Sequence, residues 1–198
     1  MDFQYAIALT GGIATGKSTV TKIFSLCGFH FIDADEVAHT VLDEQHRAIA
    51  EMFGEELIMH NKKVDRKALG SIIFGDPQKR LALESLLHPL IYEEIRQQAL
   101  EQNKKKIPFI IDIPLFFEGG RYGIEKSIVV YAPKEEQLKR LMQRDRYNEE
   151  DALKRIESQM DIEEKRRRAT YVIDNSGDLQ QLQHEYKRVK EEILKDFS

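Results

Sequence analysis

A glycine-rich turn near the amino terminus limits the folds that this sequence can adopt. Residues 10–19 read Thr-Gly-Gly-Ile-Ala-Thr-Gly-Lys-Ser-Thr, which contains the pattern G-x-x-x-x-G-K-[S/T]. The apolar run 5–9 precedes this turn, and apolar residues follow it at helical spacing. A buried strand, a glycine loop and a helix in this order let backbone amides converge on phosphate groups. The sequence therefore predicts an α/β fold with a phosphate-binding loop.

Two polar side chains at the end of the turn suit a nucleoside triphosphate with Mg²⁺. Lys17 is a compact cation for the β- and γ-phosphate oxygens, and the Ser18 hydroxyl is a ligand for the metal. The alternative, a glycine turn without a ligand, is disfavoured because a strand precedes the turn and a helix follows it. We expect these residues to contact the nucleotide: Gly11, Gly12, Ile13, Ala14, Thr15, Gly16, Lys17, Ser18 and Thr19.

Length and charge narrow the class of protein. The chain has 198 residues, 41% hydrophobic and 32% charged, as expected for one compact domain with a sizeable core. The formal net charge of −4 argues against nucleic-acid binding through bulk electrostatics. The single cysteine, Cys27, excludes an internal disulfide, and we expect it to pack in the core. Without a signal segment or a long apolar run, we expect no membrane association and a cytoplasmic location.

Five short apolar runs alternate with helical patterns along the chain. The strands are expected at residues 5–9, 29–32, 107–111, 128–131 and 171–173. This alternation predicts an α/β fold, a doubly wound five-stranded parallel sheet that binds ligands at the carboxyl ends of its strands. The core is expected at about 1–43 and 105–198. A helical insertion at about 44–104 would bind the substrate, and a helical lid is expected at about 138–168.

Three aspartates are candidates for chemistry at the strand ends. Asp33 follows the second strand, which we expect beside the phosphate loop, and it suits a general base. Asp35 is as well explained as the N-cap of the next helix. Asp112 ends the third strand and would order Mg²⁺, or it would simply be a turn residue. A carboxylate beside the loop favours a kinase for a small hydroxyl acceptor.

A guanine-nucleotide switch is disfavoured by a missing carboxylate. Such proteins read guanine with Asn-Lys-x-Asp, whereas residues 61–64 read Asn-Lys-Lys-Val. The chain is also shorter than most mechanochemical ATPases. Two classes of function stay open beside the one developed below. One is a kinase for a small acceptor such as a nucleoside or a sugar acid, and the other is a nucleotide-dependent switch without enzymatic activity.

The order of short motifs along almost the whole chain resembles the dephospho-coenzyme A kinase family. These motifs are Thr10 to Thr19, Ile32-Asp33-Ala34-Asp35, Asp65-Arg66, Leu87-His88-Pro89, Pro114-Leu115-x-x-Glu118, Gln137-x-x-Arg140-Leu141-x-x-Arg144, Gln159 and Asn175. The resemblance implies transfer of the γ-phosphoryl group of ATP to the ribose 3′-hydroxyl of dephospho-coenzyme A. It leaves the oligomeric state open.

The same resemblance assigns the acceptor site. It makes Asp33 the base on the 3′-hydroxyl, and it places the following residues in the acceptor pocket: Arg66, His88, Pro114, Leu115 and Glu118. Physical reasoning alone supports them unevenly. A lone arginine at a helix start is usually a surface residue, and Glu118 precedes two glycines and so also suits a loop. Pro89 predicts an extended or turn conformation at His88.

Basic residues and an amide in the last third are candidates for the ATP site. Arg140 and Arg144 lie four residues apart on a predicted helix, so they share a face and suit a lid that closes over phosphates. The alternative is a solvated face, the interpretation that we favour for the run 165–168. Asn175 follows the last strand, where we expect an ATP contact. Ala14 replaces a glycine of the family pattern, which is compatible if its φ stays negative.

Overall fold

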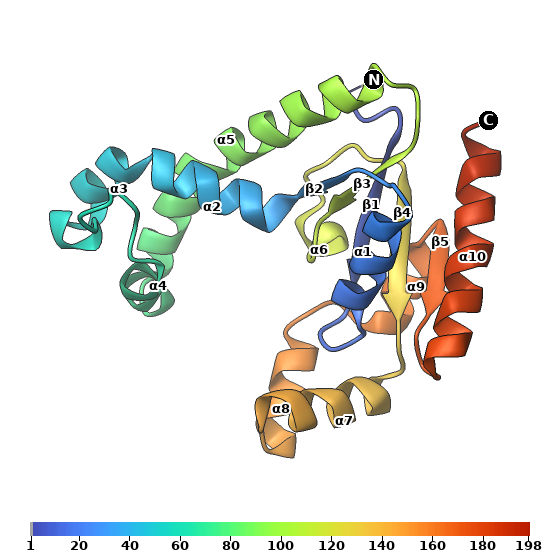
Figure 1. Cartoon of the computed structure of the whole chain (residues 1–198). Coiled ribbons are helices and arrows are strands. Elements are labelled where there is room, and N and C mark those ends of the chain that lie inside the picture. The colour runs from blue at the N-terminus through green and yellow to red at the C-terminus, as the bar shows by residue number, and fades with distance from the viewer. Residues whose placement is uncertain (1) are drawn as a thin grey trace. The chain divides into compact units, whose positions relative to one another are not determined.

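The computed structural model describes residues 2–198, and its centre is a five-stranded sheet (Figure 1). The strands are β1 (Ala6–Gly11), β2 (Phe31–Asp33), β3 (Phe109–Asp112), β4 (Lys126–Tyr131) and β5 (Tyr171–Asp174). Their order in the sheet is β2-β3-β1-β4-β5. The pairs β1–β3, β1–β4 and β4–β5 run parallel. The predicted α/β fold with a five-stranded parallel sheet is confirmed.

The strand order corrects one expectation. The neighbour of β1 on the β2 side is β3, so the strand that ends at Asp112 lies beside the phosphate loop. β2, which ends at Asp33, lies at the edge of the sheet. The sequence pattern identified each strand but contains no local signal for the lateral order, because that order depends on how the connections cross the sheet.

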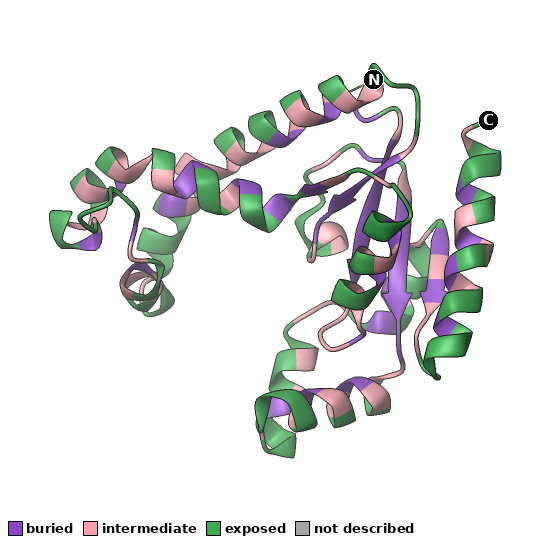
Figure 2. Ribbon diagram, viewed as in Figure 1, coloured by how far each residue is buried: buried purple, intermediate pink, exposed green. Residues whose placement is uncertain are grey.

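Helices cover both faces of this sheet. The helices that lie wholly in residues 2–32 and 99–198 are α1 (Lys17–Leu26), α6 (Phe116–Gly119), α7 (Lys134–Asp145), α8 (Glu149–Glu157), α9 (Ile162–Arg168) and α10 (Leu179–Asp196), of which α7 and α8 pack against each other. Val130 packs in a core cluster with α1 and α10, whereas Val129 packs with Ile162 of α9 in another. Successive side chains of a strand point to opposite faces. Figure 2 shows the resulting burial of β1, β3 and β4 along nearly their whole length.

The chain divides into two compact units, one formed by residues 1–32 and 99–198 and the other by residues 33–98. The second, here called the helical unit, contains most of its residues in helices: α2 (Ala34–Glu44), α3 (His46–Phe53), the 3-10 turn η1 (Glu55–Leu57), α4 (Arg66–Phe74) and part of α5 (Pro77–Asn103). It has its own core of Leu42, Ile49, Leu57, Val64, Leu69 and Leu83. Its helices therefore bury apolar side chains against one another.

Two local expectations are wrong. Pro89 lies inside α5, so His88 is helical and not in a turn. A proline inside a helix costs about 3 kcal/mol, and burial of Leu83, Ile95 and Ala99 along the same helix offsets this cost. Cys27 is exposed, because it caps the end of α1 beyond the buried stripe. Among residues 2–198, no helix has the length and apolarity needed to cross a lipid bilayer.

Candidate active site

The phosphate loop joins β1 to α1, and two of its glycines are needed for steric reasons. Gly16 has φ 90°, a left-handed conformation that L side chains rarely adopt, and it begins α1. A Cβ atom on Gly16 would lie 2.2 Å from Asn175 Nδ2, and one on Gly11 would lie 2.9 Å from the Val130 carbonyl oxygen. The backbone amides at the start of α1 lie outside the i→i−4 pattern and are available to an anion.

Ala14 departs from the expectation of a negative φ, since its φ is 60°. The left-handed region costs an L-residue about 1–2 kcal/mol relative to the right-handed one. The loop must therefore be held by contacts elsewhere that outweigh this strain.

Three side chains from distant segments hold alternate residues of the loop. The Lys165 ammonium donates to Gly11 O at 2.9 Å. The Gln159 Oε1 atom accepts a hydrogen bond from Ile13 N at 2.9 Å. The Asn175 amide donates to Thr15 O at 2.7 Å. These contacts fix the curvature of the loop.

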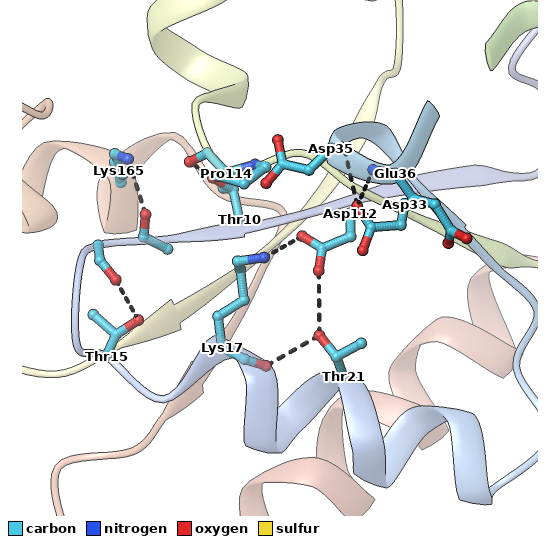
Figure 3. A network of polar contacts seen from close by, with 12 residues as sticks. Thr10, Thr15, Lys17, Thr21, Asp33, Asp35, Glu36, Asp112, Pro114 and Lys165 are labelled. Atoms are coloured by element: carbon cyan, nitrogen blue, oxygen red, sulfur yellow. Dashed lines mark hydrogen bonds and ion pairs between the residues drawn. The ribbon is translucent and has the colours of Figure 1, made fainter. Parts of the chain in front are cut away.

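Lys17 makes an ion pair with Asp112 at the end of β3 (Figure 3). The second carboxylate oxygen of Asp112 accepts a hydrogen bond from the Thr21 hydroxyl at 3.4 Å. Asp112 is only 6% exposed, which strengthens its electrostatic interaction with the lysine. The structure thus brings together the predicted phosphate lysine and the predicted metal carboxylate.

Lys165 is the functional candidate that the sequence analysis missed. Its side chain is 0% exposed, and Nζ lies 2.7 Å from Glu118 Oε1. The expectation of a solvated basic run is wrong at this residue, although Arg166, Arg167 and Arg168 are exposed as expected. One signal was available: Lys165 follows the buried Ile162 by three residues, so the two share a helical face.

The segment after β3 supplies three predicted acceptor residues. The Pro114 carbonyl accepts a hydrogen bond from the Thr10 hydroxyl at 2.8 Å, which ties this segment to the end of β1. Leu115 is about half exposed and precedes α6. The Glu118 carboxylate accepts from Met160 N at 3.0 Å in addition to its ion pair with Lys165. Glu118 therefore has partners within the protein, which the sequence did not indicate.

The two predicted lid arginines differ in their surroundings. Arg140 donates from Nη2 to the Asn175 carbonyl at 2.8 Å and pairs with Glu136 at 3.0 Å. Arg144 is 61% exposed and makes two hydrogen bonds of 2.8 Å to the adjacent Asp145. Those hydrogen bonds lower the pKa of the Asp145 carboxyl below its ordinary value. Only Arg140 lines the cleft described next.

A cleft of about 630 Å³ begins at the base of the phosphate loop. It is lined by Gly16, Thr19, Arg140, Asn175, Gly177, Asp178, Leu179, Gln180 and Leu182. Leu179 is exposed although it belongs to the apolar stripe of α10. The structure thus brings four predicted nucleotide contacts to the same concave surface: Gly16, Thr19, Arg140 and Asn175.

The remaining candidates belong to the helical unit or begin it. Asp33 is the N-cap of α2, since its Oδ1 atom accepts from Asp35 N at 2.9 Å and Glu36 N at 3.1 Å. The N-cap role considered for Asp35 therefore belongs to Asp33, and Asp35 lies in the first turn of α2. Arg66 pairs with Asp43 at 3.0 Å and is 44% exposed. His88 lies in α5, on a different helix of the same unit.

Comparisons with known proteins agree on one family. A family model described as dephospho-CoA kinase matches residues 5–181. The dephospho-CoA kinase of Sulfurimonas denitrificans is 52% identical over 193 residues, covering 98% of this chain and 96% of the relative. The chain belongs to the dephospho-CoA kinase family.

Structures and further relatives agree with this family assignment. The dephospho-CoA kinase of Wolinella succinogenes is 45% identical and covers 98% of this chain and 97% of its own. The solved structure of the dephospho-CoA kinase from Campylobacter jejuni superposes with a TM-score of 0.73 at 38% identity, covering 96% and 97% of the two chains. That of TT1252 from Thermus thermophilus gives 0.77 at 34% identity, with 94% and 96% covered. The resemblance inferred from the motifs is confirmed, and the chain is a kinase.

Proposed function

We propose that this member of the dephospho-CoA kinase family transfers the γ-phosphoryl group of ATP to the ribose 3′-hydroxyl of dephospho-coenzyme A, giving coenzyme A and ADP. The observation that carries the proposal is a family match spanning residues 5–181, which include Lys17, Asp112, Arg140 and Asn175. We further propose a small-molecule acceptor, with no nucleic-acid partner, and action in the cytoplasm.

The phosphate loop and the adjoining cleft suit ATP. Phosphates would bind the amides at the start of α1, where the helix dipole favours negative charge. Lys17 would then contact the β- and γ-phosphate oxygens, after exchanging part of its interaction with Asp112. The cleft starts at Gly16 and Thr19 and continues to Leu179, so the adenosine would lie against the beginning of α10. An exposed leucine at this place gives an apolar surface for the flat base.

Ser18 and Asp112 suit a Mg²⁺ ion. Mg²⁺ prefers oxygen ligands, keeps several waters and is commonly held by one or two carboxylates together with substrate phosphates. The Asp112 carboxylate ends β3 and the Ser18 hydroxyl lies in the first turn of α1, and both elements adjoin the loop. When bound, the metal would neutralise charge on the β- and γ-phosphates.

Asp33 is our candidate for the group that takes the acceptor proton. Its two capping hydrogen bonds both end on Oδ1, so we assign Oδ2 to the 3′-hydroxyl. The capping bonds also fix the orientation of the carboxylate, which matters because phosphoryl transfer depends mainly on alignment. Arg66 and His88 would bind the rest of the acceptor, and a cationic guanidinium suits its phosphates.

Arg140 is our candidate for stabilising the transferred group. Its guanidinium is held by Glu136 and the Asn175 carbonyl, and it lines the same cleft as Gly16. A planar fork of donors can bind two phosphate oxygens at once. The helices α7 and α8 would then act as the lid that we expect at about 138–168.

An ADP-release assay over a panel of acceptors tests the proposal. The panel contains dephospho-coenzyme A, a nucleoside, a sugar acid and no acceptor. We expect ADP release that depends on dephospho-coenzyme A and stops when Mg²⁺ is chelated. Faster release with the nucleoside or the sugar acid would identify a kinase for another acceptor. ATP binding without release under any condition would identify a nucleotide-dependent switch.

A further inference from the structure

Lys165 is a charged side chain without access to solvent. Its side chain is 0% exposed, and its ammonium has two contacts, 2.9 Å to Gly11 O and 2.7 Å to Glu118 Oε1. Burial of an ammonium costs several kcal/mol unless it is paired and hydrogen-bonded. Such a pair is often no more stabilising than apolar residues of similar size. Stabilisation of the fold therefore does not explain why a lysine occupies position 165. The groups that its ammonium contacts indicate its role.

Both partners of Lys165 belong to segments that meet at the phosphate loop. Gly11 is the last residue of β1 and the first glycine of the loop. Glu118 lies in α6, four residues after the Pro114 carbonyl that binds Thr10. This segment continues directly from β3, whose last residue, Asp112, pairs with Lys17. The ammonium thus joins the beginning of the loop to the segment that carries its counter-charge.

We propose that Lys165 is a positioning residue for phosphoryl transfer, which acts by holding the Gly11 carbonyl and so the start of the phosphate loop relative to the segment after β3. Gln159 supports the same loop at Ile13 from the segment just before α9. Asn175 holds a third loop residue, Thr15. Ala14, with a strained φ of 60°, lies between the anchored residues Ile13 and Thr15. Without the Lys165 contact, the first anchor is lost and the strained loop can relax away from the geometry that aligns the γ-phosphate.

This inference rests on the proposed function, and kinetics of Lys165→Met test it. Methionine keeps the apolar stem and removes the ammonium. We expect kcat with dephospho-coenzyme A to fall about 10- to 100-fold, because small misplacement of a reacting group has effects of this size. The KM for ATP should change less than threefold, since Lys17 and the loop amides remain. The concentration of active sites is determined by titration with nucleotide, and each rate is divided by it. Partial unfolding of the variant then does not lower the measured kcat.

The matched control is Arg167→Met on the same helix. Arg167 is exposed and pairs only locally, with Glu164 three residues earlier. We expect its kcat and KM to stay within twofold of the parent. A kcat of Lys165→Met within twofold of the parent, or a change confined to the KM for ATP, would overturn the inference.

A second background separates positioning from simple neutralisation of Glu118. Lys165→Met is also measured in a Glu118→Gln variant, where no carboxylate is left unpaired at this position and the side chain can still accept from Met160 N. If Lys165 acts through Gly11, its removal lowers kcat about 10- to 100-fold in this background too. Loss of the effect there would mean that Lys165 only balances the charge of Glu118, and it would overturn the inference.

The Glu118→Gln background also provides the test if the single variant Lys165→Met does not fold. Comparison of Glu118→Gln with the double variant then carries the measurement. Failure of the proposed function is distinguishable, because it would appear as the absence of acceptor-dependent ADP release in the parent protein. Failure of the inference would appear as an active parent protein and an equally active variant.

Discussion

The phosphate loop and the helical unit are held in different ways. The three side chains that fix the loop are those of Lys165, Gln159 and Asn175. They are separated in sequence from the loop residues that they contact by 154, 146 and 160 positions, respectively. In the helical unit, Arg66 pairs with Asp43 from the same unit, and Asp33 caps the helix that it begins. The loop is therefore shaped by contacts from across the fold, whereas Asp33 and Arg66 are held by partners within the helical unit. We expect loop substitutions to lower kcat and helical-unit substitutions to weaken acceptor binding.

Asp33 is an exception to the expectation that helical-unit substitutions affect only acceptor binding. It begins the helical unit, and yet we propose that it acts in the chemical step. Asp33→Asn keeps the capping acceptor but cannot take the hydroxyl proton. We expect the single-turnover rate to fall by roughly 10²- to 10⁴-fold. Dissociation constants for ATP and dephospho-coenzyme A should stay within about threefold. A variant with more than about a tenth of the parent rate would exclude the base role and leave Asp35 and Asp112 to test.

Lys17→Ala tests the loop itself. The substitution removes the cation that matches the β/γ charge and leaves Asp112 without its partner at this position. We expect turnover to fall by about 10²- to 10³-fold, the usual loss when one group that stabilises developing charge is removed. The measurement is steady-state ADP release at saturating ATP and Mg²⁺. Turnover within a few-fold of the parent would show that this loop is not the donor site.

Arg140→Lys tests whether the lid helix contributes to the transition state. Lysine keeps the charge but loses the fork that contacts both Glu136 and the Asn175 carbonyl. We expect kcat to fall about tenfold, with a smaller effect on ATP affinity. The adjacent exposed Lys139, changed to Ala, is the control and should keep parental kinetics. A change confined to the KM for ATP would reassign Arg140 to ground-state binding.

Arg66→Ala tests the expectation that substitutions in the helical unit weaken acceptor binding. If Arg66 binds an acceptor phosphate, its removal should raise the KM for dephospho-coenzyme A about five- to tenfold, because a charge-assisted hydrogen bond at an exposed site contributes about 1 kcal/mol. The expected kcat is unchanged. Lys67→Ala, one residue further along α4 and also exposed, is the control. A drop in kcat at an unchanged KM would contradict the division between loop and helical unit.

The smallest expected effect is on stability. Ala14→Gly relieves about 1–2 kcal/mol of left-handed strain but adds about 0.4–1 kcal/mol of unfolded-state entropy. We expect a net gain near 0.5 kcal/mol, or a rise in Tm of about 1–2 °C for a chain of this size. Thermal unfolding followed by circular dichroism measures it. A lower Tm would mean that other contacts favour the alanine methyl group more than the strain disfavours it.

The sequence was a good guide wherever a local pattern determines structure. Each of the five predicted strands overlaps a strand of the sheet, because buried parallel strands appear as short apolar runs between helical patterns. The glycine motif also identified the loop, since it states both the backbone shape and the phosphate lysine. The position of Asp112 beside Lys17 depends on strand order, which no local pattern contains.

What the sequence missed depends on tertiary contacts. Lys165 belongs to a run of four basic residues, and apart from its helical spacing from Ile162 only the packing of α9 separates the buried one from the exposed three. Pro89 is tolerated because apolar residues elsewhere in α5 are buried. Ala14 adopts a positive φ because contacts on both sides of it fix the loop. The assignments of Arg66, His88 and Glu118 to the acceptor remain predictions.

The contacts of Asn175 have a consequence for how this site can vary during evolution. Its main-chain nitrogen donates to Tyr131 O at 2.8 Å and its main-chain oxygen accepts from Arg140, so both links survive any side chain at position 175 that keeps the backbone. Only the bond to Thr15 O depends on the amide. A Cβ atom on Gly16 would clash with that same amide. Position 16 is therefore expected to remain glycine whatever residue stands at position 175, because its φ of 90° disfavours any side chain even where that amide is absent.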